Sequence, residues 1–184
     1  MTVIAPAGRR SRVQEGPEGL EVVVPAKRNV FGMLFLLAWL GAWAFGEVGA
    51  LNQLAYGAHG VKPFMLFWLA GWTIGGGFAA FAWLWMLAGR ERILLRPRTL
   101  AIRHEVFGVG RTREYDLAHV RNLRVSPAAY DPYGWGAGAR SWGLGGGPVA
   151  FDYGAKTVRL VGSVEEAEAA QIVRELNARH AFAE

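Results

Sequence analysis

The chain has 184 residues, with 20 lysines and arginines against 15 acidic residues and a formal net charge of +5. Hydrophobic residues make up 52% of the sequence and charged residues only 19%, and this combination is unusual for a soluble basic domain. No cysteine occurs, which excludes disulfide scaffolds, thiolate metal sites and thiol chemistry. The length accommodates one ordinary domain, or a small domain together with a membrane element.

Two apolar stretches account for most of the hydrophobicity. Residues 30–46 carry no charge, and the stretch continues more weakly past Glu47 to Tyr56; residues 63–89 also carry no charge. A membrane-spanning helix needs roughly 20 mainly apolar residues. We therefore expect transmembrane helices at 30–56 and 63–89, joined by an extracytoplasmic link at 57–62. A buried core helix is the less favoured interpretation of each stretch.

The basic residues next to the two stretches indicate their orientation, because lysine and arginine concentrate on the cytoplasmic side of membrane helices. Only Lys62 lies in the link, whereas the outer flanks of the two stretches are basic. The flanking cations are Arg9, Arg10, Arg12, Lys27, Arg28, Arg90, Arg92, Arg96, Arg98 and Arg103. We expect a multi-pass protein of a bacterial inner membrane with both termini in the cytoplasm.

Small residues within the two stretches predict close helix packing. Gly71 and Gly75 are four residues apart, and Gly41 lies in the first stretch. The expected partner is the other helix of the hairpin, and contact with a second copy or another protein is the alternative. Glu47 is expected at the far membrane interface, where it is solvated or meets Lys62; a buried partner within the membrane is the other possibility.

The remainder of the chain has the alternating pattern of strands. We expect strands at 20–24, 93–96, 99–107, 111–115, 120–125, 149–153 and 157–161, with a turn at 108–110. Ser163 and Glu166 have the spacing of a helix capping box. The helix that follows has one apolar stripe, formed by Ala169, Ile172, Val173 and Leu176.

Strands followed by one C-terminal amphipathic helix give the order of a pleckstrin-homology-like (PH-like) domain. Together with the entry segment 24–29, the exit segment 89–91 and the late hairpin 151–157, this order resembles bacterial membrane proteins that join a two-helix hairpin to a PH-like domain. The resemblance covers residues 20–180. It implies a PH-like β-sandwich or barrel of about seven antiparallel strands, closed by the C-terminal helix. That family has no single assigned activity, so no catalytic residue is carried over.

These observations divide the chain into six segments. Residues 1–19 are expected to be flexible, and 20–29 to form a strand that joins the PH-like sheet. The two spans and their link follow, and residues 90–184 are expected to form the cytoplasmic domain. That domain contains a glycine-rich loop at 126–148. A loop of this length is usually functional or disordered.

The candidate binding residues are cations and loop tryptophans. Two arginines separated by one residue share a strand face, and such a face near a membrane attracts anionic lipid. The candidates are Arg96, Arg98, Arg111, Arg113, Trp135 and Trp142. The surplus of cations is too small to predict nucleic-acid binding.

No catalytic constellation emerges from the sequence. The four histidines are scattered without metal-ligand spacing, and Asp116 and His119 are expected to be an exposed pair. We therefore expect a protein without enzymatic activity, metal or cofactor. Two functions stay open: a cytoplasmic domain that binds a protein partner or anionic lipid headgroups, or an accessory structural subunit of a larger membrane complex that assembles through its helices.

Overall fold

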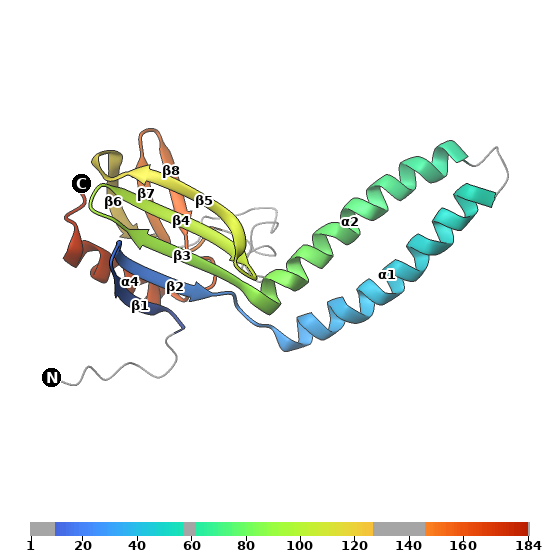
Figure 1. Ribbon diagram of the computed structural model, residues 1–184, viewed down its shortest axis with the longest axis horizontal. Helices are drawn as coiled ribbons and strands as arrows, with labels where there is room; N and C mark the ends of the chain where they lie inside the picture. Colours follow the sequence, from blue (N-terminus) through green and yellow to red (C-terminus); the bar gives the residue numbers. More distant parts are fainter. Residues whose placement is uncertain (1–9, 57–61, 127–145, 184) are drawn as a thin grey trace. The chain divides into compact units, whose positions relative to one another are not determined.

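The computed structural model describes residues 10–56, 62–126 and 146–183, and it divides into two compact units (Figure 1). One is a sheet unit, built from the N-terminal part of the chain up to Lys27 and from Ala88 onward. The other is a helical unit, residues Arg28–Leu87. The chain therefore leaves the sheet unit for the helices and returns to it.

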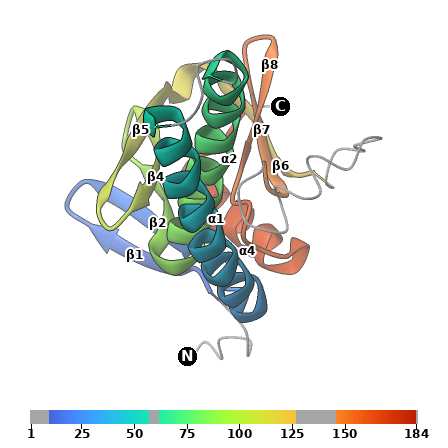
Figure 2. The same ribbon diagram turned by 90° about the vertical axis from the view of Figure 1, so that its right-hand side faces the viewer.

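The helical unit is a hairpin of α1 (Val30–Tyr56) and α2 (Lys62–Ala88), which run side by side (Figures 1 and 2). Each helix has 27 residues and is about 40 Å long. Both are long and apolar enough to cross a membrane. The bounds of α1 are those predicted, whereas α2 begins and ends one residue earlier than expected. Gly89 belongs instead to the strand that follows, with no linker between them.

Five antiparallel strands form the larger sheet in the order β1-β2-β3-β4-β5. Their bounds are Arg12–Gly16 (β1), Gly19–Pro25 (β2), Gly89–Leu95 (β3), Thr99–Val106 (β4) and Val109–Asp116 (β5). Alternate residues of β2 and β3 are buried, which is the pattern of strands with one core-facing side. The predicted N-terminal strand does join the sheet, because Val22 of β2 pairs with Ile93 of β3.

Strand β1 lies in a segment that was expected to be flexible, and that expectation was wrong for residues 12–16. Its sequence, RVQEG, is almost wholly polar and has no alternating pattern. The strand forms because the turn after Gly16 folds it back onto β2, where all five of its residues find Cα partners. Pairing with a buried neighbour therefore stabilises a strand that lacks its own hydrophobic signal.

The smaller sheet has the order β6-β7-β8, with bounds Val120–Val125, Val149–Tyr153 and Lys156–Leu160. The short 3₁₀ helix η2 (Leu117–His119) separates β5 from β6, and the chain passes to the second sheet there. Over the described residues, eight antiparallel strands thus form two open sheets; the expected antiparallel sheet domain is confirmed, but of the expected sandwich or barrel the closed barrel was wrong. Side chains of both sheets and of α4 (Glu166–Arg179) share one core, which includes Val22, Ile93, Phe151 and Ile172.

Helix α4 has the expected apolar stripe, which is buried, but not the expected cap. The helix begins at Glu166 after Glu165, whose side chain makes no capping hydrogen bond. Ser163 instead belongs to a turn after Val161. Val161 has a φ of 62°, and its N–H donates to the side chain of Glu91. The capping-box prediction was therefore wrong, because tertiary contacts fix the entry to the helix.

Candidate lipid-binding surface

Arg96 follows β3 on the outer face of the larger sheet, and its charge is already paired. Its guanidinium lies 2.7 Å from Glu18 Oε2 and 3.0 Å from Glu114 Oε1. The hydrogen bond to Glu18 is the main cause that raises the pKa of Arg96 above its ordinary value. An arginine between two carboxylates has no surplus charge to offer a lipid headgroup.

The same outer face holds a second group of paired charges. Arg92 and Arg103 are cross-strand partners on β3 and β4, where two like charges would repel. Glu105 lies between them, with its carboxylate oxygens 2.7 Å from Arg92 Nε and 3.1 Å from Arg103 Nε. Arg92 also lies 3.0 Å from Glu21. Only 4% of the Glu105 side chain is exposed, so this is a structural charge cluster.

A cavity of about 440 Å³ lies over this outer face. Its polar lining includes Arg92, Arg96, Arg103, Glu18 and Glu21. The three arginines that line the cavity are paired with four acids, Glu18, Glu21, Glu105 and Glu114. The face is thus polar without being cationic.

The four arginines predicted to form a binding face do not come together. Arg111 and Arg113 pair across the sheet with His104 and Ile102, so they lie on the face opposite to Arg96. Arg98 lies in the turn between β3 and β4. Arg111 and Arg113 do share one face of β5, as their spacing predicted, but Arg96 and Arg98 lie beyond the end of β3, and the register puts Arg96 on the opposite face from the first pair.

Both connections to the helices are made at one end of the larger sheet. Pro25, the last residue of β2, pairs with Arg90, and the N–H of Ala26 donates to the carbonyl of Gly89 at 2.9 Å. Gly89, the first residue of β3, pairs with Val106. The β4–β5 turn therefore lies at the same end of the sheet as the two points where the chain meets the helical unit.

The register and the rise per strand residue give the distance of each arginine, along its strand, from the end of the sheet at Gly89. At about 3.3 Å per residue, Arg90 lies about 3 Å along the strand from the level of Gly89, and Arg111 about 7 Å. Arg113 lies about 13 Å away and Arg96 about 23 Å away. Within the described residues, no carboxylate forms an ion pair with Arg90 or Arg111. In the part of the chain that the structure describes, cations without a carboxylate partner are therefore present at the end of the sheet where the helices connect.

The β4–β5 turn consists of Phe107 and Gly108, one residue earlier than the predicted turn at 108–110. Their φ angles are 52° and 82°. Arg103 Nη2 donates to the carbonyl of Gly108 at 2.7 Å and holds the turn. Phe107 and Val109 are exposed on either side of the glycine. Sequence reasoning missed these two residues, although an apolar pair around a turn glycine was visible.

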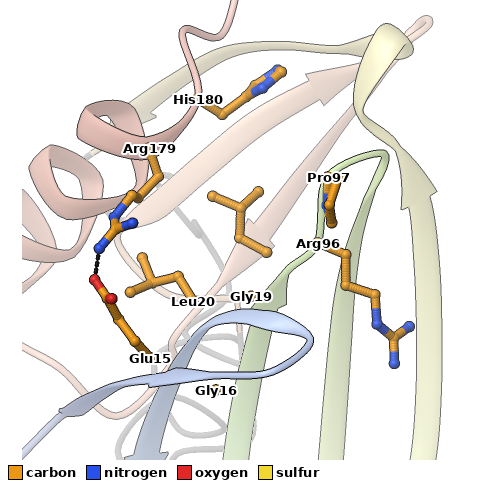
Figure 3. Close-up of a pocket in the computed structure, with 9 residues that line it drawn as sticks. Glu15, Gly16, Gly19, Leu20, Arg96, Pro97, Arg179 and His180 are labelled. Atoms are coloured by element: carbon orange, nitrogen blue, oxygen red, sulfur yellow. Dashed lines mark ion pairs between the residues drawn. The ribbon is translucent and has the colours of Figure 1, made fainter.

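A groove of about 280 Å³ lies at the opposite end of the sheet (Figure 3). Figure 3 shows Glu15 and Arg179 paired along one side of it, with Leu20 beside this pair and His180 near the top of the view. The groove therefore lies between the β1–β2 turn and the C-terminal end of α4. Its charges are mixed, and one ion pair already satisfies two of them.

A buried acid connects the two sheets. Glu91 on β3 is 6% exposed, and its Oε1 accepts from the N–H of Val161 at 2.9 Å. Burial raises the pKa of Glu91, while His104, whose Nε2 lies 3.6 Å away, and the N–H groups of Val161 and Gly162 oppose that rise. The contact holds Val161 in its left-handed conformation after β8, so the role of Glu91 is structural.

Asp152 organises the smaller sheet in a similar way. Arg124 Nη1 lies 2.7 Å from its Oδ2, and the Thr157 hydroxyl donates to its Oδ1 at 2.7 Å. The hydrogen bonds from Arg124 and Thr157 are the main causes that lower the pKa of Asp152. Asp116 and His119 lie 3.6 Å apart and are both exposed, and the Asp116 side chain also accepts from the N–H of Ala118.

The glycines predicted to pack the helical hairpin are not the ones in contact. A Cβ at Gly41, Gly71 or Gly75 would meet no atom within 4 Å, so the prediction that they pack within the hairpin was wrong. A Cβ at Gly76 would lie 2.0 Å from Cε2 of Trp43. The helices meet instead where the Trp43 ring crosses Gly76 and its Nε1 donates to the carbonyl of Trp72 at 3.1 Å.

Glu47 has a partner within the hairpin. The hydroxyl of Thr73 on α2 donates to Glu47 Oε1 at 2.6 Å. Glu47 Oε2 is buried and makes no hydrogen bond within the described residues. The contact lies nine residues before the end of α1, which favours the interhelical interpretation of Glu47 over the interfacial one.

Trp135 and Trp142 lie outside the described residues, as does most of the glycine-rich loop. The ends of the loop are described, and the N–H of Ser126 donates to the carbonyl of Pro148 at 2.7 Å. Within the described residues, no group of three or more potential metal ligands occurs. Comparisons with protein-family models, curated proteins and solved structures find no match.

Proposed function

We propose that this chain is a non-enzymatic, two-span protein of a bacterial inner membrane whose cytoplasmic, PH-like sheet domain binds anionic lipid headgroups. Both termini lie in the cytoplasm in this proposal, and α1 and α2 anchor the domain. The binding surface is the end of the larger sheet at which both helices connect.

The exposure of the two helices supports the membrane part of the proposal. A core helix of a soluble protein is mostly buried, but only 11% of the most apolar stretch of either helix is buried. Large aromatic side chains lie on the outer surface, including Phe31, Phe45, Phe67 and Phe78. A helix that is hydrophobic on all sides and unburied by protein is stable when lipid surrounds it.

The position of the unpaired cations is the observation that carries the binding part. Gly89 directly follows α2, and the proposal places the end of the membrane crossed by α2 near Gly89. Measured along the strands from the level of Gly89, Arg90 and Arg111 lie about 3 Å and 7 Å away, within the Debye length of about 8 Å at physiological salt. Arg96 and Arg113 lie beyond it. Each cation near an anionic surface contributes about 1 kcal/mol, which is about a fivefold change in a binding constant.

Lipid selectivity of the full-length protein tests this proposal. The protein is reconstituted in phosphatidylcholine vesicles that contain a trace of spin-labelled phosphatidylglycerol or spin-labelled phosphatidylcholine. The fraction of each probe that is motionally restricted gives their relative association with the protein. We expect a preference for phosphatidylglycerol that falls several-fold in Arg111→Gln and that weakens at high salt.

Arg98→Gln is the matched control, since it removes the same charge at the far end of the same sheet. It should leave the preference unchanged. Equal restriction of the two probes by the wild-type protein would overturn the proposal. Stoichiometric co-purification of other proteins together with that result would favour the accessory-subunit function.

A further inference from the structure

We propose that the Phe107–Gly108 turn, with Val109, is an apolar wedge that enters the headgroup region of the anionic bilayer in which α1 and α2 are anchored. This inference rests on the proposed function, because it requires that α2 crosses a membrane ending close to Gly89. It adds an apolar contact and a named insertion site to a surface so far described only by its cations.

The exposure of these two side chains sets them apart from the rest of the sheet unit. Phe107 is 66% exposed and Val109 is 80% exposed. Every other exposed large hydrophobic residue within the described parts of the chain lies in α1 or α2. Among its described residues, the sheet unit thus exposes large apolar side chains at one place, which is a two-residue turn with its flanking valine.

The backbone of the turn adds an independent argument. Two central residues with positive φ are the mark of the type I′ hairpin turn, for which Asn-Gly is the favoured sequence. Gly108 meets this requirement without strain. Phe107 has a φ of 52°, which is uncommon for a bulky residue and costs of order 1 kcal/mol or more. Because Phe107 is also 66% exposed, burial within the fold offsets little of that cost, and a contact outside the fold would offset more of it.

The register brings the wedge to the membrane. Val106, next to Phe107, is the Cα partner of Gly89, and antiparallel partners lie about 5 Å apart. No linker separates Gly89 from the end of α2. The tip of the hairpin therefore lies within one strand residue of the partner of Gly89, where the chain leaves α2, and the proposal places that point at the depth of the headgroups.

The neighbouring charges fit the same occupant. Arg111 and Arg90 follow within two residues of the tip level, and the bond from Arg103 to the Gly108 carbonyl fixes the turn. Apolar and aromatic side chains at the tip with cations just behind them match the layers of an anionic bilayer, with acyl chains below and phosphates above. A protein partner bound at this tip would have to displace lipid from a site that lies only one strand residue from the end of α2.

Because the sequence contains no cysteine, a single substitution gives a unique labelling site. We would place a nitroxide spin label at Val109→Cys in the full-length protein, reconstituted in vesicles of phosphatidylcholine with phosphatidylglycerol. Collision of the label with oxygen, which concentrates in the bilayer, is compared with collision with a water-soluble nickel chelate. Arg98→Cys, in the exposed turn at the opposite end of β3 and β4, is the matched control.

We expect the label at 109 to be accessible to oxygen and protected from nickel, and the label at 98 to show the reverse. Adding Phe107→Asn, which restores the favoured turn sequence, should keep the fold but move the label at 109 toward water. Equal nickel accessibility at 109 and 98 would overturn the inference, as would spin–spin broadening at 109 that shows contact with a second copy.

The lipid-selectivity measurement separates the two proposals. If phosphatidylglycerol preference persists while the label at 109 stays in water, the wedge is refuted and headgroup binding stands. If the preference is absent in the wild-type protein, the proposed function itself fails. A label at 109 that is protected only in vesicles with phosphatidylglycerol supports both.

Discussion

The contact between Gly76 and the Trp43 ring makes a quantitative prediction for the helical hairpin. Replacing Gly76 with alanine adds a Cβ that would lie 2.0 Å from Cε2, 2.2 Å from Cζ2 and 2.6 Å from Nε1 of Trp43. Ordinary contact requires at least about 3.4 Å, so the ring must move by more than an ångström. That movement breaks the 3.1 Å hydrogen bond from Trp43 to the carbonyl of Trp72.

Two terms give the expected size of the effect. Overpacking in a well-packed contact costs about 1–3 kcal/mol. An interhelical hydrogen bond in a membrane protein contributes about 0.6 kcal/mol on average. Together they predict that Gly76→Ala destabilises the hairpin by about 2–3 kcal/mol. Gly75→Ala is the matched control, because its Cβ would meet no atom within 4 Å.

Unfolding of the full-length protein by dodecyl sulfate in mixed micelles, followed by tryptophan fluorescence, measures this difference. We expect the Gly76→Ala transition at a distinctly lower detergent fraction, with Gly75→Ala and Gly71→Ala within about 1 kcal/mol of wild type. Similar transitions for Gly75→Ala and Gly76→Ala would refute the assignment of Gly76 as the packing glycine.

Three further predictions follow from polar contacts. Thr73→Val removes the hydroxyl that donates to Glu47 and should cost about 0.5–1.5 kcal/mol in the same detergent titration, whereas Glu47→Gln keeps an acceptor and should cost less. The pKa of buried Glu91 is raised in the folded state, so its contribution to stability is complete below the pKa of the unfolded state and is lost as pH rises through the pKa of the folded state. Glu91→Gln should therefore gain thermal stability relative to wild type as pH increases. A difference in melting temperature that stays constant with pH would contradict this. The pKa of Asp152 is lowered mainly by Arg124, so the contribution of Asp152 to stability is present above the pKa of the unfolded state and is lost as pH falls through the pKa of the folded state. Arg124→Gln should raise the pKa of Asp152, which carboxyl NMR titration measures. An unchanged pKa would contradict the role given to Arg124.

Local patterns in the sequence identified most of the elements. The alternation in β2, β3 and β4 and the apolar stripe of α4 appear in the structure as buried faces. The first helix also has its predicted bounds. Strand β1 was missed because its polar residues acquire order only by pairing with β2, and the helix cap was misplaced because a buried contact to Glu91 fixes the preceding turn.

The candidate surface was harder to predict than the fold. Arg96 and Arg111 look equivalent in the sequence, but Arg96 lies between two carboxylates from distant segments and Arg111 does not. A Cβ added at the predicted packing glycines, Gly41 on α1 and Gly71 and Gly75 on α2, would meet nothing within 4 Å, whereas a Cβ at Gly76, one residue after Gly75, would meet Trp43. In both cases the sequence identified the type of residue, an arginine or a glycine, but not which residue it contacts in the fold.

The sequence by itself determined that the chain combines two long apolar helices with a sheet domain, because hydrophobic length and alternation are local properties. Only the tertiary structure decided which cations are paired, which glycine packs and that the Phe107 turn lies level with Gly89. These depend on strand register and helix rotation, and a shift of one residue reverses the face of a strand or turns a helix by about 100°. Among the described residues, the basic charge is therefore divided between cations held in ion pairs and cations that form none, and the latter include Arg90 and Arg111 at the end of the sheet where the helices connect.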